Sequence, residues 1–240
     1  MPKRSLRILL LFLFLGGAVA FVGWWFVPVS SSFTKAWLLA ALAALWMGLL
    51  GLGWARKGVR WIVLSLPVLI LGGLMLPSRE INRDALRDAY VKRMRSFEGT
   101  RYYWGGEGRN GIDCSGLPRR AFRDALLAEG VKHPDGAALR SAVEQWWFDA
   151  SARALSEGYR DYARPLGITG TVRSIDRTSL LPGDMAITTD GVHVVIYVGE
   201  GHWIQADPGT EKVLTLDPLV SDNGWFDKKV AMFRWAQLGQ

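Results

Sequence analysis

The chain of 240 residues contains one cysteine and three histidines, and this scarcity excludes several kinds of site. A single thiol cannot form an internal disulfide. Structural zinc sites gather four cysteine or histidine ligands at short spacing, whereas Cys114, His133, His193 and His202 lie in separate segments. The glycine-rich stretch 105–111 lacks the lysine and the spacing of a phosphate-binding loop. We therefore expect no metal and no cofactor.

Acidic residues are missing from the first 77 positions, which contain seven basic side chains. These positions carry the whole formal charge of +7, and the remainder is neutral with 22 basic and 22 acidic residues. The excess of basic residues is therefore not spread over a nucleic-acid-binding surface, and we expect no nucleic-acid partner. The composition predicts a membrane anchor in residues 1–77, in contact with lipid, followed by a globular domain in residues 78–240.

Three apolar runs, at 8–29, 36–54 and 61–76, predict about three transmembrane helices. At 1.5 Å per residue the third run reaches only about 24 Å, against a hydrocarbon core of about 30 Å. Basic clusters at 3–7 and 56–60 place the N-terminus and the connection between the second and third runs in the cytoplasm. Three crossings then deliver the globular domain to the outer side. A cleaved signal peptide, suggested by Ala18-Val19-Ala20, is the alternative for the first run, and it would leave the domain on the same side.

Cys114 lies within YYWGGEGRNGIDCSGL, residues 102–117, where a turn of small residues leads into a predicted helix. A helix N-terminus and a nearby histidine can lower the pKa of a thiol, which favours a reactive thiolate and rapid alkylation. Such a cysteine would act as a nucleophile toward an acyl group. The alternative is a cysteine that serves only as a small buried hydrophobe.

His193 opens HVVIYVGEG, a run that predicts a strand, whereas His133 lies in a surface loop. A three-residue loop centred on Gly199 would place His193 directly opposite Gln205, with His202 on the other face. A two-residue turn would break this pairing, because a shift of one residue exchanges the faces. The preferred register thus makes His193 a candidate base, with Gln205 as its polar partner.

Helical periodicity and strand composition predict an α+β domain, in which helices pack on a mainly antiparallel sheet. Pro118 suggests that the helix after Cys114 starts late or bends. The aromatic cluster 146–148 is expected in the core or at the membrane surface. The expected helices span 83–97, 115–127 and 137–155, and the expected strands span 183–188, 193–198, 203–206 and 230–235.

The motifs YYWGG, DCSG, LPGD, HVVIYVGEG and HWIQA follow one another in a fixed order. In this respect the chain, over about residues 84–235, resembles the NlpC family of bacterial cell-wall cysteine peptidases, which have a papain-like fold. The resemblance implies that Cys114 is the nucleophile, His193 the base and Gln205 the group that orients the base. It also implies that Tyr102 contacts the substrate or the oxyanion. Asp113 would support the site or grip the amino group of the peptide.

The chain departs from the family pattern at two points. Gln205 stands where many relatives have histidine, but its amide oxygen can accept the same hydrogen bond. The stretch between Cys114 and His193 is long, which predicts an insertion at 147–170.

Together with the anchor predicted from composition, the resemblance implies a membrane-anchored thiol hydrolase that cleaves an amide bond in peptidoglycan stem peptides. It would reside in the bacterial inner membrane, with its catalytic domain on the periplasmic or extracellular side. Two alternatives remain open: a thiol amidase or acyltransferase on a substrate outside the wall, and an inactive scaffold or binding module of the same fold.

Overall fold

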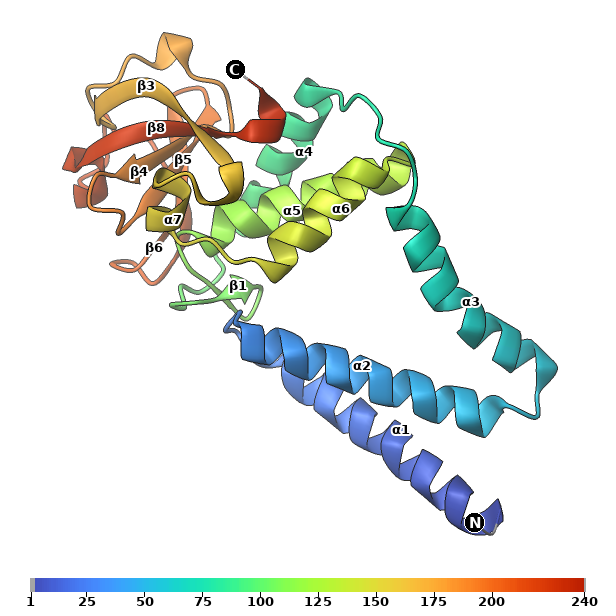
Figure 1. Cartoon of the computed structure of the whole chain (residues 1–240). Helices are drawn as coiled ribbons and strands as arrows, with labels where there is room; N and C mark the ends of the chain where they lie inside the picture. Colours follow the sequence, from blue (N-terminus) through green and yellow to red (C-terminus); the bar gives the residue numbers. More distant parts are fainter. Residues whose placement is uncertain (1–2, 240) are drawn as a thin grey trace.

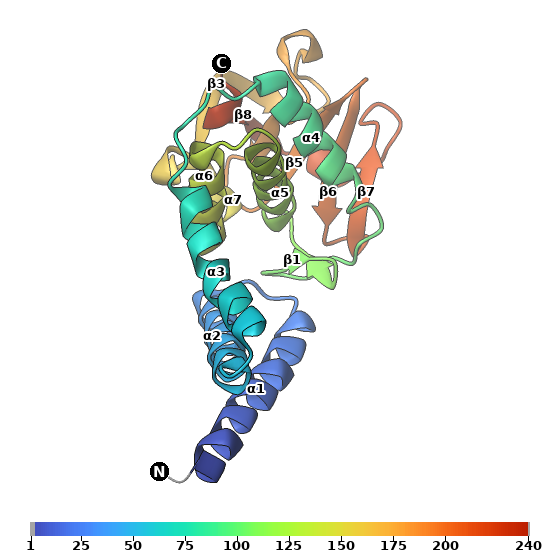
Figure 2. The same cartoon turned by 90° about the vertical axis from the view of Figure 1, so that its right-hand side faces the viewer.

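The computed structural model describes residues 3–239, with three long N-terminal helices and a domain of helices packed on a sheet (Figures 1 and 2). The long helices are α1 (Lys3–Trp25), α2 (Ser32–Gly53) and α3 (Lys57–Leu74). Each is long and apolar enough to cross a membrane, which confirms the predicted number of apolar helices. The first helix ends earlier than expected, so that residues 26–31 form a loop.

Helices α1 and α2 lie side by side, and small residues allow their close approach (Figure 1). A Cβ atom added to Gly48 would lie 2.7 Å from the backbone nitrogen of Phe14, and one added to Gly17 would lie 2.8 Å from that of Leu45. Such contacts are typical of helices that associate within membranes. Helix α2 begins at Ser32 because Ser31 and Thr34 form a reciprocal capping box at its N-terminus. Helix α3 leaves the far end of this pair and returns to the domain beside α6 (Figure 1).

Residues 78–239 of the domain contain four α-helices. The helix predicted at 137–155 is wrong as a single element, because Phe148 has an extended backbone with φ −101° and ψ 95°. The chain then starts a new helix, which Ser151 caps through the backbone N–H of Ala154. The helices are α4 (Arg83–Arg95), α5 (Gly116–Lys132), α6 (Gly136–Trp147) and α7 (Ala152–Ser156).

Helix α5 follows the cysteine and starts at Gly116, so the delayed start that Pro118 suggested does not occur. The proline lies in the first turn, where a backbone N–H would have no partner within the helix. Phe122 of this helix stacks on Trp235 with ring centroids 4.6 Å apart, and Tyr90 of α4 meets Phe122 edge-on at 5.3 Å. These rings fix α4 and α5 on one face of the sheet.

The sheet has six antiparallel strands in the order β3-β8-β4-β5-β6-β7. Its two edge strands were not predicted. A separate pair, β1 (Glu107–Gly108) and β2 (Gly111–Ile112), precedes the cysteine. The main strands are β3 (Ala163–Thr171), β4 (Met185–Thr188), β5 (Val194–Gly199), β6 (His202–Asp207), β7 (Lys212–Leu216) and β8 (Lys229–Trp235).

Both faces of the sheet are buried. One face packs against the helices in a cluster that includes Leu117, Phe122 and Ile204, and Cys114 belongs to this cluster. The other face, with Trp203, packs against Phe226 and neighbouring loops. The expected insertion at 147–170 stays a prediction, as does the domain boundary at 77/78. The segment 147–170 forms the end of α6, helix α7, a short 3₁₀ turn and most of edge strand β3.

Candidate active site

Cys114 lies just before helix α5 and against the start of strand β5. Its Sγ is 3.8 Å from the carbonyl oxygen of Val192, and the backbone N–H of Val194 also acts on the sulfur. The nucleophile candidate therefore contacts the residues on both sides of His193. The sulfur is largely covered, since Cys114 is only 8% exposed.

Asp113 holds the turn around the cysteine. One carboxylate oxygen accepts hydrogen bonds from the Gly116 N–H at 2.5 Å and from the Ser115 hydroxyl at 3.0 Å. The other accepts the Gly105 N–H at 2.8 Å. Both oxygens are thus occupied within the chain. This supports the structural role expected for Asp113 over direct capture of a peptide amino group.

His193 and Gln205 form the hydrogen bond that the sequence predicted. The distance from His193 Nε2 to Gln205 Oε1 is 2.7 Å, and both side chains are buried. An amide oxygen only accepts, so Nε2 carries the proton and donates it. The other ring nitrogen, Nδ1, is left unprotonated in the neutral imidazole. It is the atom available to receive the proton of a thiol.

The hairpin that carries this pair has a different register from the expected one. Glu200 and Gly201, with φ of 52° and 80°, form a two-residue turn that pairs Gly199 with His202. The expected three-residue loop is therefore wrong. A shift between Tyr197 and Gly199 then pairs Ile196 with Ile204. If this pairing is continued along the strands, Gln205 lies diagonally across from His193. The two side chains are on the same face of the sheet, because the bulge compensates for the one-residue shift that would otherwise exchange the faces.

Two residues that were not predicted from the sequence support the imidazole. The ring of Trp225 stacks on His193 with centroids 4.0 Å apart and an angle of 18° between the planes. Asp207 accepts a hydrogen bond from Trp225 Nε1 at 3.3 Å and another from the Asn223 amide at 2.8 Å. Asp207 follows Gln205 by two positions on strand β6, which was a usable signal. Trp225 carried no such signal, because it reaches the site from the distant segment 224–227.

Tyr102 lies against the same core as Cys114, and the charges of Cys114 and Asp113 act on its phenol. Burial, together with these groups, raises the pKa of Tyr102 to about 12. The hydroxyl is therefore protonated at neutral pH and can donate a hydrogen bond. A hollow of about 350 Å³ has Asp207, Asn223 and Trp225 in its lining, whereas Cys114 and His193 do not line it.

Burial dominates the acid–base properties of the free site. Burial and the Asp113 carboxylate raise the pKa of Cys114 to about 12, against the effect of nearby backbone N–H groups. Burial lowers the pKa of His193 to about 4, although the hydrogen bond to Gln205 opposes this shift. The resting pair is therefore a thiol and a neutral imidazole. Burial of the sulfur thus opposes the lowering of the thiol pKa that was expected from the helix N-terminus.

These pKa values predict an alkylation profile. The rate at which iodoacetamide modifies Cys114 should rise about tenfold per pH unit up to pH 10 or beyond, because only the thiolate reacts. At pH 7 the modification should be slower than that of free cysteine. The rate can be followed by mass spectrometry without interference, since the chain has no other thiol. Rapid modification that is constant between pH 5 and 8 would instead indicate a thiolate–imidazolium pair.

Within residues 3–239, no group of three or more histidine, cysteine or acidic side chains is arranged to hold a metal ion. His133 lies at the exposed end of α5 and His202 bonds the Glu200 carbonyl at 2.8 Å, so neither joins His193. The structure thus brings together five predicted residues around the start of α5 and the adjoining hairpin: Tyr102, Asp113, Cys114, His193 and Gln205.

Comparison with known proteins identifies the class to which this arrangement belongs. Residues 99–234 match the NlpC/P60 family, and the chain belongs to that family. The α+β, papain-like fold predicted from the sequence is confirmed.

Among particular relatives, the chain is 27% identical over 136 residues to the murein DD-endopeptidase/murein LD-carboxypeptidase MepS of Escherichia coli K12. The aligned part covers 55% of this chain and 54% of that protein, so the chain spans about half the length of the curated relatives it matches.

Solved structures resemble the chain at lower identity. NlpC1 from Trichomonas vaginalis is 20% identical with a TM-score of 0.41, covering 66% of this chain and 46% of that one. The peptidoglycan hydrolase RipB from Mycobacterium tuberculosis is 21% identical with a TM-score of 0.38, covering 62% and 65%.

Proposed function

We propose that the protein is a membrane-anchored cysteine peptidase that cleaves an amide bond in the peptide part of peptidoglycan. The observation that carries this proposal is the 2.7 Å hydrogen bond from His193 to Gln205, formed beside the chain's single cysteine within the family-matched segment. The names of relatives support the substrate class, since MepS is a murein endopeptidase and RipB a peptidoglycan hydrolase.

The geometry supports a two-step hydrolysis through an acyl-enzyme. Cys114 Sγ attacks the amide carbonyl carbon while His193 Nδ1 takes the thiol proton, which removes the need for a preformed thiolate. The backbone N–H of Cys114 and the Tyr102 hydroxyl stabilise the oxyanion. His193 then returns the proton to the leaving nitrogen, and a free amine departs from the thioester.

In the second step a water molecule attacks the thioester while His193 again accepts a proton. The carbon–sulfur bond breaks, the sulfur recovers a proton, and the acyl part leaves as a carboxylic acid. Gln205 acts throughout by holding the imidazole in the tautomer that leaves Nδ1 free. Trp225 limits the rotation of the same ring by stacking on it.

The proposal is tested by incubating purified peptidoglycan with the full chain in detergent and analysing the soluble products by mass spectrometry. Hydrolysis should release fragments in which one stem-peptide amide has become a free amine and a carboxylate. The Cys114→Ala protein, prepared in parallel, should release none. Intact peptidoglycan together with turnover of a different amide or ester would favour the amidase or acyltransferase alternative. A chain that turns over neither substrate would favour the scaffold alternative.

We further infer that the anchor spans the bacterial inner membrane and that the catalytic domain lies on the periplasmic or extracellular side. The basic clusters at 3–7 and 56–60 lie at the ends of the apolar helices remote from the domain (Figure 1). Alkaline phosphatase fused after residue 240 should therefore be active, and a reporter that fluoresces only in the cytoplasm should be dark. The reverse pattern would show that α3, with 18 residues, does not span.

A further inference from the structure

The loop between α1 and α2 contacts the segment that leads to the cysteine. The backbone N–H of Ser30 donates to the Gly105 carbonyl at 2.8 Å, and the Glu107 N–H donates to the Pro28 carbonyl at 3.3 Å. Val29 and Gly106 form an antiparallel bridge. A segment of the anchor is thus paired, strand-like, with the glycine-rich loop 105–111.

This pairing reaches the nucleophile in a short series of contacts. Gly105 accepts from Ser30 and donates its own N–H to the carboxylate of Asp113 at 2.8 Å. Asp113 is bonded covalently to Cys114. The anchor loop is therefore two hydrogen bonds away from the residue that precedes the cysteine.

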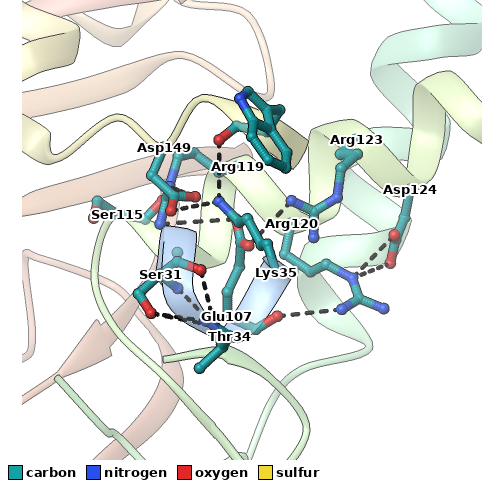
Figure 3. A network of polar contacts seen from close by, with 12 residues as sticks. Ser31, Thr34, Lys35, Glu107, Ser115, Arg119, Arg120, Arg123, Asp124 and Asp149 are labelled. Atoms are coloured by element: carbon teal, nitrogen blue, oxygen red, sulfur yellow. Dashed lines mark hydrogen bonds and ion pairs between the residues drawn. The ribbon is translucent and has the colours of Figure 1, made fainter. Parts of the chain in front are cut away.

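A second route reaches the residue that follows the cysteine, as Figure 3 shows. Lys35, in the first turn of α2, is buried, with Nζ 2.5 Å from the carboxylate of Asp149 and 3.3 Å from the Trp147 carbonyl. Asp149 also accepts from Arg119 at 2.7 Å, and Arg119 Nε donates to the Ser115 carbonyl at 3.3 Å. Lys35 thus connects to the start of helix α5.

The charges in this network are balanced only when Lys35 is present. The buried carboxylate of Glu107 lies 3.1 Å from Arg123 and 3.7 Å from Arg119. Burial opposes its ionisation, yet the two arginines, with a smaller effect from Lys35, hold the pKa of Glu107 below its ordinary value. Together with Asp113 and Asp149 the cluster has three acidic and three basic groups: Glu107, Asp113 and Asp149 with Lys35, Arg119 and Arg123. Without Lys35 the cluster has one excess negative charge, and Asp149, whose side chain is 31% exposed, keeps only Arg119 as a partner, which weakens its hold on Arg119 and the start of α5.

We propose that the α1–α2 hairpin is a working part of the active site, and that Lys35 is a positioning residue for the nucleophile. The hairpin holds the residue before Cys114 through Ser30 and the residue after it through Lys35. A displacement of about 1 Å at a reacting atom can lower the rate of the chemical step by up to about 100-fold. Contacts that fix the position of Cys114 therefore affect this rate. The inference rests on Cys114 being the nucleophile, but it does not depend on the identity of the substrate.

The test compares Lys35→Met with Lys35→Arg in the full chain. Lys35→Met should lower kcat about tenfold with KM changed less than twofold, because the variant moves the nucleophile and leaves the substrate contacts in place. Iodoacetamide should modify Cys114 several times faster, since the loosened loop covers the sulfur less well. Lys35→Arg should restore kcat to within about threefold of the original chain, because it replaces the charge.

The matched control is Lys57→Met. Lys57 is also a lysine in the first turn of an apolar helix, but it makes no ion pair within the described part of the chain, so both readouts should stay unchanged. A folded Lys35→Met protein with unaltered kcat and alkylation rate would overturn the proposal. The alkylation readout needs no substrate, so a wrong choice of substrate is distinguishable from a wrong role for the hairpin.

A second pair of variants decides the matter if Lys35→Met does not fold. Ser30→Pro removes the N–H that bonds Gly105, whereas Ser30→Ala keeps it and removes only the hydroxyl. Ser30→Pro should lower kcat and speed alkylation relative to Ser30→Ala. Equal values in both readouts would show that the loop does not brace the nucleophile.

Discussion

Replacing Cys114 by alanine or serine should abolish hydrolysis, with a loss on the order of 10⁴-fold or more, while the domain stays folded. In the proposed mechanism the sulfur forms and breaks the bond to the acyl group, and neither alanine nor serine offers a thiol for this step. The thiol makes weak contacts, to the Val192 carbonyl and to backbone N–H groups such as that of Val194, so its removal should cost little stability. The measurement is turnover of peptidoglycan or a stem-peptide substrate, with thermal unfolding recorded for each protein.

His193→Ala should cause a comparable loss, and the double variant with Cys114→Ala should be no worse than either single one. Residues that act in one step show this lack of additivity. His133→Ala is the matched control, because this histidine lies 57% exposed at the far end of α5 and its change should be silent. Substantial turnover by Cys114→Ala would remove the cysteine mechanism altogether.

The residues that lie together at the candidate site could be predicted from the sequence better than their surroundings could. Cys114, His193 and Gln205 could be predicted because ordered motifs place them at the start of a helix and on two consecutive strands. Trp225 was missed because its contact with His193 joins segments far apart in the chain. Asp207 was missed although its position on strand β6, two residues after Gln205, was a usable signal. Lys35 in turn looked like one more basic residue of the anchor, because nothing in the sequence indicates an ion-pair partner 114 positions away.

The missed strands were the two edges of the sheet. Strand β3 contains Pro165, Gly167 and Gly170, which are uncommon inside strands. As an edge strand it is paired on one side only, so its sequence shows little alternation of apolar and polar residues. The register of the hairpin β5–β6 was wrong for a different reason. A bulge next to Gly199, with φ 91°, adds one residue to strand β5. The position of a bulge depends on backbone geometry, and the alternation of side chains in the sequence does not reveal it.

Gln205→Ala should lower kcat by about 10- to 100-fold with little change in KM. The amide contacts the base and not the substrate, so its loss frees the imidazole to rotate and to adopt the other tautomer. Gln205→His should retain substantial activity, because a ring nitrogen offers an equivalent acceptor. The measurements are kcat and KM for each variant, with thermal unfolding to separate the catalytic effect from the cavity that alanine leaves in this fully buried position.

His202→Ala is the control for this prediction and should be mild. His202 lies only three positions from Gln205 on the same strand, yet its side chain lies at the exposed turn and bonds the Glu200 carbonyl. The two substitutions therefore distinguish the faces of strand β6. A damaging His202→Ala beside a silent Gln205→Ala would mean that the hairpin pairs one residue out of step in the working enzyme, because such a shift exchanges the two faces.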